Sequence, residues 1–352
     1  MPDPLPASSF FDSMIFVTGG TGLIGSFVLQ ELRARGLAVR ALYRGAQAPA
    51  APAGIDWVQG DLLDISLLDQ LLTPEVTHVL HCAGLISYAP QDEDALLRVN
   101  VEGTATVVDA CLRRPGIRLG YVSSVAALGH PAADPASPST TPRLLDETAT
   151  WDLGASHPAY ATSKYLAELE VWRGVAEGLA AVIVNPSIVL GPGDWHRSST
   201  RLLRYAYDEH WFYTQGQLNF VDVRDVVAQL LRLTLDLPAL PAARYILNGG
   251  LCPLGEFLTK TAVAFGRRPP RLAVPDWAAE AIWRLEYGRA LLTGGRPLIT
   301  RDTARAGRQP VRYDAGLATR TTGLPFRPLA DTIAWLAEAT KTNRTPHPTV
   351  VS

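Results

Sequence analysis

Tyr160 and Lys164 are the two residues of this sequence whose types and spacing most directly suggest proton chemistry. They stand four positions apart in AYATSKYLAELEVW, residues 159–172, which has the pattern of a helix. At about 100° per residue they share one side of that helix with Ala167, Val171 and Val175, so the lysine stands on an apolar stripe. Lysines are seldom placed there without a partner, although the same spacing also occurs on solvated helix faces. We therefore favour a functional pair.

A row of glycines near the N-terminus suggests a dinucleotide site. Gly19, Gly22 and Gly25 fall three apart in TGGTGLIGSFVLQELRARG, and Gly20, Gly22 and Gly25 also fit the pattern G-x-G-x-x-G. They follow an apolar run and open a helical stretch that Gly36 would end. Backbone N–H groups of such a turn can approach a pyrophosphate, whose charge the helix dipole favours, whereas glycines alone also mark ordinary turns. The expected cofactor contacts here are Gly19, Gly22, Leu23, Ile24 and Gly25.

The elements that must position these residues are indicated by short apolar runs that alternate with helical stretches. The runs are MIFV, AVRALY, IDWVQ, HVLHCA, LGYVS and AAVIVN. Strands separated by helix-length segments imply parallel pairing through crossover helices. The sequence therefore predicts an α/β fold with a doubly wound parallel sheet of the Rossmann type and a smaller C-terminal substrate lobe.

Composition excludes several classes of function. The 352-residue chain is 47% apolar and 19% charged with a formal net charge of −2, so it lacks the basic face that nucleic acids or anionic lipids require. Cys82, Cys111 and Cys252 have no metal-ligand spacing, and an odd count suits a reducing compartment, so we expect no metal site. No run reaches the ~18 apolar residues of a membrane span, and the N-terminus has no signal-peptide pattern. We expect a cytoplasmic protein with a small-molecule substrate.

Eight motifs occur in the order typical of extended short-chain dehydrogenase/reductases, and this resemblance covers about residues 14–250. The motifs are TGGTGLIG, GDLLD, HCAG, VNVEGT, YVSSVAALG, YATSK, NPSIVLGPGD and NFVDVRDVV. The resemblance implies that Tyr160 is the general acid toward a carbonyl oxygen, or the base in the reverse direction. An isolated phenol has a pKa near 10, so the Lys164 ammonium and the oxidised nicotinamide would stabilise the phenolate.

The resemblance also implies roles for residues outside this helix. Ser124 would hydrogen-bond the substrate oxygen, while its neighbour Ser123 reads as a strand-end hydroxyl. Lys164 would also bind the nicotinamide ribose, and Asn100 would pack beneath the site. The remaining cofactor contacts that it implies are Asp61 and Leu62 near the adenine, Ala83 and Gly84 near the middle of the cofactor, and Pro186.

Departures from the sugar-nucleotide branch of this superfamily bear on the reaction. Related dehydratases carry Asp-Glu directly after the catalytic Ser or Thr, whereas this chain has Val125 and Ala126, which cannot donate a proton. Ile188 occupies the position where epimerases and dehydratases tend to have an asparagine near the diphosphate, a pattern closer to dihydroflavonol reductases and 3β-hydroxysteroid dehydrogenases. We expect simple hydride transfer, with a sugar-nucleotide epimerase and a non-catalytic cofactor sensor as alternatives.

The end of the second predicted strand bears on coenzyme choice. NAD-specific relatives place Asp or Glu there to accept hydrogen bonds from the adenosine ribose. This chain has Tyr43 at that position and Arg44 after it, and a guanidinium can pair with a 2′-phosphate. Arg40 adds a second arginine, although Arg44 also fits the end of an exposed strand. We predict a preference for NADP(H), with NAD(H) possible.

The substrate lobe is expected from residues 191–216 and 249–340, beside a cofactor domain of residues 13–190 with 217–248 returning to it and a flexible tail at 341–352. Aromatic residues in the lobe indicate lid packing or a hydrophobic substrate; they are Trp195, Tyr205, Tyr207, Trp211, Phe212 and Tyr213, with Trp277, Trp283 and Tyr287 further on. A second stripe on the helix of Tyr160, formed by Tyr165, Leu169, Trp172 and Ala176, predicts a homodimer unless another helix of the chain covers it.

Overall fold

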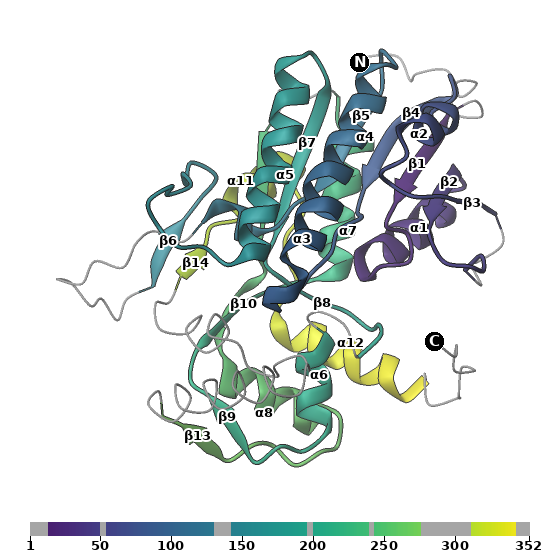
Figure 1. Cartoon of the computed structure of the whole chain (residues 1–352). Coiled ribbons are helices and arrows are strands. Elements are labelled where there is room, and N and C mark those ends of the chain that lie inside the picture. Colours follow the sequence, from purple (N-terminus) through teal and green to yellow (C-terminus); the bar gives the residue numbers. More distant parts are fainter. Residues whose placement is uncertain are drawn as a thin grey trace, which may run out of the picture.

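Seven parallel strands form the central sheet of the protein (Figure 1). The computed structural model describes residues 13–49, 54–129, 142–195, 200–238, 243–275 and 311–342. The sheet order is β11-β7-β5-β4-β1-β2-β3. Its strands are β1 (Met14–Thr18), β2 (Ala38–Tyr43), β3 (Ile55–Gln59), β4 (Val76–His81), β5 (Arg118–Val122), β7 (Ala180–Pro186) and β11 (Ala243–Leu247). Six of them coincide with the apolar runs of the sequence, which confirms the predicted Rossmann-like α/β fold.

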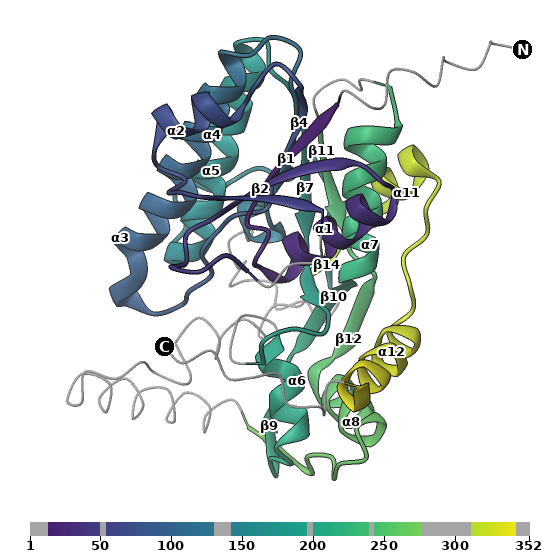
Figure 2. The same ribbon diagram turned by 90° about the vertical axis from the view of Figure 1, so that its right-hand side faces the viewer.

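Helices cover both faces of this sheet, as Figure 2 shows. One face carries α2 (Ile65–Leu71), α3 (Glu93–Leu96), α4 (Gly103–Leu112) and α5 (Ala159–Ala176). The other face carries α1 (Leu23–Ala34), α7 (Val223–Leu231) and α11 (Gly316–Thr322). Val107 and Val171 pack on the first face, and Val28 and Leu230 on the second. Because both faces are covered, the inner strands are continuous apolar runs.

A second lobe lies at the carboxyl edge of the sheet, below it in Figure 1. Its three-stranded sheet has the order β12-β10-β8. These strands are β8 (Ile188–Leu190), β10 (Gln217–Asp222) and β12 (Gly250–Pro253), and the lobe's helices are α6 (Thr200–Tyr207), α8 (Leu254–Ala264) and α12 (Leu329–Thr342). Two further parallel pairs join β9 (Phe212–Thr214) to β13 (Leu272–Val274) and β6 (Arg143–Leu145) to β14 (Val311–Tyr313).

The packing of β8, β10 and α11 shows how the chain passes between the two lobes. β10 lies in the small sheet because its alternating side chains face two cores: Leu218 and Phe220 pack in the lobe, whereas Val221 packs against the central sheet. The chain rejoins the central sheet with α7 and β11. The C-terminal α11 also packs there, with Ala318 in the central core. Residues of the second lobe therefore alternate with residues of the cofactor domain along the chain.

The second stripe of α5 is partly covered by the same chain. The Tyr165 ring stacks on Trp151 at a centroid distance of 4.3 Å, and Trp172 packs against the core, whereas Leu169 is 43% exposed. The predicted aromatic cluster Trp277, Trp283 and Tyr287 lies outside the described residues, as do residues 343–352 of the predicted tail. No helix among the described residues is both long and apolar enough to cross a membrane.

Candidate active site

Two glycines of the turn between β1 and α1, Gly19 and Gly25, are packed so closely that a side chain cannot enter at either position. Gly19 has a φ of +71°, and a Cβ there would lie 2.4 Å from the backbone nitrogen of Ala83. A Cβ on Gly25 would lie 2.1 Å from the carbonyl oxygen of Gly19. Gly22 caps α1 without a side-chain hydrogen bond, so the first N–H groups of the helix, at Leu23 and Ile24, lack a side-chain partner at the cap. Such a helix start suits an anionic group.

A buried hydrogen-bond chain connects this turn to the end of β4. The Thr104 hydroxyl donates to the carbonyl oxygen of Asn100, so it accepts from Nε2 of His81 at 3.0 Å. His81 Nδ1 then accepts from the Thr18 hydroxyl at 2.6 Å, and the Thr18 oxygen lies 3.4 Å from the N–H of Ala83. Burial, followed by the nearby Lys164 ammonium, lowers the pKa of His81 to about 3. A neutral His81 therefore holds β1 and β4 in register beneath the glycine turn.

Asn100 continues this network to the helix that carries Tyr160. Its Oδ1 accepts from the Leu85 N–H at 2.7 Å, and its Nδ2 donates to the Leu85 carbonyl at 3.0 Å and to the Ser163 hydroxyl at 2.9 Å. The Ser163 hydroxyl in turn donates to the carbonyl oxygen of Tyr160 at 2.8 Å. The loop after β4, which contains Ala83 and Gly84, is thereby tied to the start of α5.

Ser124, Tyr160 and Lys164 come together at the carboxyl edge of the sheet. Tyr160 is 7% exposed, and Ser124, which follows β5, lies near enough to its phenol to lower the pKa of that phenol. Lys164 is 5% exposed, and its Nζ donates to the Val122 carbonyl at 3.1 Å. A Cβ on Gly84 would lie 3.3 Å from this Nζ, so a residue without a side chain leaves room for the lysine. The structure thus brings together all three predicted catalytic residues and one predicted cofactor contact.

The electrostatics of the site follow from burial. Burial raises the pKa of the Tyr160 phenol, and nearby Tyr88 raises it further, whereas the hydrogen bond with Ser124 lowers it. Burial lowers the pKa of Lys164 to about 8, against the opposing effects of Glu168 and Cys82. The two groups therefore rest as a phenol and an ammonium near neutral pH.

The remaining predicted cofactor contacts surround this edge. Asp61 is exposed after β3 with its Oδ1 accepting from the Leu63 N–H, and the Leu62 side chain packs beside Gly103. Pro186 is buried at the end of β7. Together with the glycine turn they follow the ends of neighbouring parallel strands, where doubly wound proteins bind nucleotides.

The two arginines of β2 differ in their surroundings. Arg44 is exposed directly after the last residue of the strand, Tyr43. Arg40 lies in the middle of the strand, where its Nε donates to Asp56 at 2.7 Å and its Nη1 donates to the Leu71 carbonyl at 3.1 Å. Three residues of strand span about 10 Å, so Arg40 does not belong to the carboxyl edge. Only Arg44 of the two is placed as the 2′-phosphate hypothesis requires.

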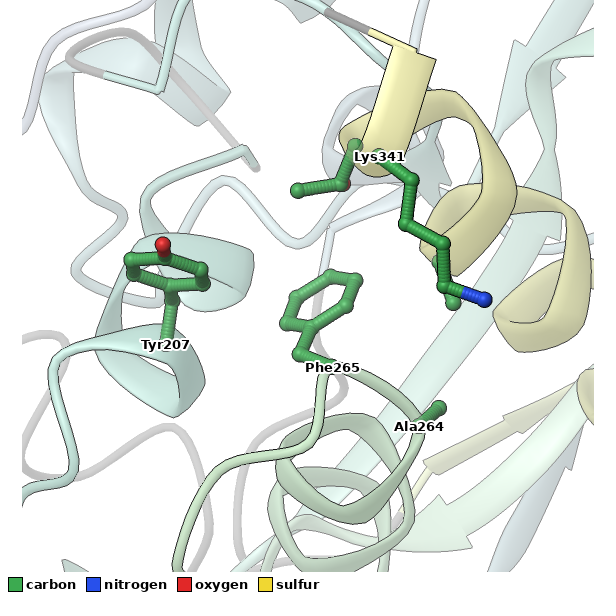
Figure 3. Close-up of a pocket in the computed structure, with 6 residues that line it drawn as sticks. Tyr207, Ala264, Phe265 and Lys341 are labelled. Carbon is green, nitrogen blue, oxygen red and sulfur yellow. The ribbon is translucent and has the colours of Figure 1, made fainter. Parts of the chain in front are cut away.

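The aromatic residues of the second lobe pack mainly against one another. Trp195 lies 5.1 Å from Tyr207 and 5.8 Å from Phe265 between ring centroids. Figure 3 shows Tyr207 and Phe265 in a pocket of about 100 Å³ beside Lys341, formed by α6, α8 and α12. None of the three predicted catalytic residues lines this pocket, so we do not assign it to the chemistry. The His210 ring stacks on Tyr205 at 4.2 Å, which gives it a packing role in the lobe.

Two residues near the site were missed by sequence reasoning. Glu168 is 2% exposed on α5, and its place at the edge of the stripe that carries Lys164 is the pattern that would have indicated it. Tyr88 lies in the loop after β4 with its ring 5.6 Å from that of Tyr160, and no sequence pattern predicts this contact. Among the described residues, no three His, Cys, Asp or Glu side chains are grouped so that they could hold a metal ion.

These features fit a dinucleotide. Gly19 and Gly25 have no Cβ that would collide with neighbouring backbone, so the turn can pack closely at the start of α1. Gly84 leaves the space beside Lys164 open. The glycine turn would hold the pyrophosphate on backbone N–H groups, and Lys164 would hold the nicotinamide ribose.

Comparisons with known proteins agree with this geometry. The model of the NAD dependent epimerase/dehydratase family matches residues 15–240. A Synechocystis protein provisionally named dihydroflavonol 4-reductase is 34% identical over 335 residues, or 91% of this chain and 93% of that protein. Sterol demethylase protein B of Methylococcus capsulatus is 30% identical over 345 residues, or 92% and 98%. The crystal structure of gox2253 matches with a TM-score of 0.76 at 29% identity, covering 95% of this chain and 99% of that one. The chain therefore belongs to the NAD dependent epimerase/dehydratase family of extended short-chain dehydrogenase/reductases and is an NAD(P)-dependent enzyme.

Proposed function

We propose that this enzyme transfers a hydride between NADP(H) and a carbonyl or alcohol group of a hydrophobic small molecule. The observation that carries the proposal is the arrangement of Ser124, Tyr160 and Lys164 beside the glycine turn. It provides a hydrogen-bond donor for a substrate oxygen, a proton donor next to it and a buried cation beneath. These are the groups that carbonyl reduction needs from a protein.

Each side chain has a defined task in the reductive direction. The Ser124 hydroxyl holds the carbonyl oxygen, and the Tyr160 hydroxyl donates its proton to that oxygen. The bound nicotinamide supplies the hydride, and it accepts one in the reverse direction. Because burial raises the pKa of Tyr160, the phenol stays protonated until the substrate oxygen takes up charge. The Lys164 ammonium then stabilises the phenolate, which recovers a proton from solvent.

Exposed apolar side chains that follow the ends of β4 and β7 favour an apolar substrate over a sugar nucleotide, and one of them, Tyr88, contacts Tyr160. Ile86 and Tyr88 of the loop after β4 are each 46% exposed, and Ile188 at the start of β8 is 37% exposed. Val125 and Ala126 stand in the turn directly after Ser124, where a dehydratase needs an acid and a base. Exposed apolar side chains near a catalytic group are typical of sites for hydrophobic ligands.

The coenzyme proposal depends on Arg44. Its guanidinium is exposed at the carboxyl end of β2, and Tyr43 stands where a carboxylate would select NAD(H). Since Arg40 is bound to Asp56, Arg44 alone supports the preference for a 2′-phosphate. NAD(H) stays compatible with the fold itself.

The test is a panel of hydrophobic ketones, aldehydes and alcohols, measured with both coenzymes through the absorbance of reduced nicotinamide. We expect oxidation of NADPH that depends on an added carbonyl and is abolished in Tyr160→Phe. The family name gives the second candidate, a sugar-nucleotide epimerase. Coenzyme that copurifies with the protein, together with isomerisation of a nucleotide sugar without net redox change, would support that candidate. Coenzyme binding without turnover of either kind would indicate a sensor.

A further inference from the structure

Glu168 is a buried carboxylate that the proposed mechanism does not use. It lies on α5 one turn after Lys164 and is 2% exposed. Its Oε2 accepts from the Ser123 hydroxyl and from Nδ2 of Asn185, both at 2.8 Å, and its Oε1 accepts from Nη1 of Arg244 at 3.2 Å. Ser123 directly follows β5, Asn185 lies in β7 and Arg244 lies in β11, so three different strands bring hydrogen-bond donors to one carboxylate.

This carboxylate reaches the catalytic serine through two routes. Ser123 is the residue directly before Ser124. The Asn185 amide that donates to Glu168 also donates to the Ser124 carbonyl at 3.0 Å. Arg244 extends the network, because its Nε donates to the Glu147 carbonyl at 2.9 Å. The main chain of Ser124 is thus held from both sides by groups that converge on Glu168.

The charge of Glu168 is also distinctive among the groups that face Lys164. The other titratable groups around this lysine are His81 and Cys82 at the end of β4, Tyr121 on β5 and Tyr160 on α5. Burial keeps His81 neutral and raises the pKa of the Cys82 thiol to about 12. It also raises the pKa values of the two phenols. Of these groups in the described chain, Glu168 is the one that carries a carboxyl group.

A buried carboxylate costs free energy unless partners compensate it, and Ser123, Asn185 and Arg244 are those partners here. We propose that Glu168 is a positioning residue, which aligns Ser124 through Ser123 and Asn185 and acts electrostatically on Lys164, one helical turn away. The predicted effect of Glu168 on turnover rests on the proposed function. The predicted effect of Glu168 on the pKa of Lys164 does not rest on it, because that effect exists in the protein without substrate.

The composition of the chain offers a direct measurement. The sequence contains only three lysines, Lys164, Lys260 and Lys341. In protein labelled with ¹³C at the lysine Cε, three signals can be assigned with Lys260→Arg and Lys341→Arg and then titrated. In the unmutated protein we expect the Lys164 midpoint at about 8. Glu168→Gln should lower it by about one pH unit or more, as expected for loss of a nearby opposite charge. Glu168→Asp should restore most of the shift.

Two further variants make the result decisive. Glu170→Gln is the matched control, because Glu170 lies on the same helix in a surface pair with Arg173 and should leave the Lys164 midpoint unchanged. Arg244→Gln removes the cation that competes with Lys164 for the charge of Glu168, so it should raise the titration midpoint of Lys164. If Glu168→Gln does not fold, the Arg244→Gln variant by itself tests the inference. An unchanged midpoint in the folded variants would overturn the inference.

Turnover supplies the second readout. Where the unmutated enzyme reduces a carbonyl, Glu168→Gln should lower kcat at least tenfold, leave the coenzyme Kd within about twofold, and move the alkaline limb of the pH profile to lower pH. A kcat and pH profile equal to those of Glu170→Gln would refute the positioning role. If the unmutated enzyme reduces no carbonyl, the proposed function fails, and the lysine titration still decides the role of Glu168.

Discussion

Replacing Gly25 with alanine tests whether the glycine turn is built for a dinucleotide. The new Cβ would lie 2.1 Å from the Gly19 carbonyl oxygen, whereas real contacts of this kind stay beyond 3.0 Å, so the turn must shift by about 1 Å. Gly19 has little freedom to adjust, because the side on which a Cβ would stand is occupied by the backbone of Ala83. Overpacking of this kind costs about 1–3 kcal/mol of stability.

The same shift should weaken coenzyme binding. The Gly22 N–H donates to the Gly19 carbonyl at 2.9 Å, so displacing that carbonyl also displaces the start of α1. Loss of one hydrogen bond to a charged phosphate costs about 1.5–3 kcal/mol, which corresponds to roughly 10- to 150-fold in Kd. Titration calorimetry with NADP(H) and NAD(H), together with thermal unfolding of the apoprotein, measures both effects.

Two other glycines supply the controls. Gly36→Ala meets nothing within 4 Å but has a φ of +70°, so it should cost about 1 kcal/mol of stability and leave the coenzyme Kd unchanged. Gly22→Ala has a Cβ 3.3 Å from the Gly19 oxygen and an extended φ, so it should leave the apoprotein stable while obstructing a pyrophosphate. Coenzyme binding by Gly25→Ala at the unmutated affinity would refute the assignment of this turn.

Four further predictions concern the site and the surface. Tyr160→Phe should lower kcat by roughly 10²–10⁴-fold with a nearly unchanged coenzyme Kd, whereas Lys164→Ala should impair both turnover and coenzyme binding. Near-normal turnover of Tyr160→Phe in steady-state assays would show that another group is the acid. Arg44→Ala should weaken NADP(H) more than NAD(H) by about 1.5–3 kcal/mol, and equal affinities of the unmutated enzyme for the two coenzymes at fixed ionic strength would contradict the coenzyme assignment. Because the folded-state pKa of His81 is lowered to about 3 from 6.5, the unfolded chain takes up a proton first as the pH falls, so stability should decrease below pH 6.5; urea-unfolding midpoints that stay level down to about pH 4.5 would exclude this. Because Leu169 of the second α5 stripe is exposed, we still predict a homodimer that covers it. A monomeric mass in light scattering at micromolar concentration would count against this prediction.

Local patterns in the sequence predict the elements and the order in which they meet the cofactor. Alternation of apolar runs with helical stretches predicts six of the seven central strands, because burial on both faces selects continuous apolar segments. The spacing of Gly19, Gly22 and Gly25 indicates a turn with close backbone contacts, and the spacing of Tyr160 and Lys164 indicates one helix face. Periodicity and glycine positions depend on neighbours within a few residues, so they can be read without the fold.

Which distant residues share a site follows from the packing of whole elements. Glu168 meets Ser123, Asn185 and Arg244 across 45, 17 and 76 positions of sequence, contacts that exist only because three strands end beside one helix. Likewise, the structure shows that Arg40 is bound to Asp56 whereas Arg44 is exposed. This difference comes from the neighbours of β2 in the fold, and the sequence of the strand does not show it. Contacts of this kind depend on how whole elements pack, and local patterns carry no information about that packing.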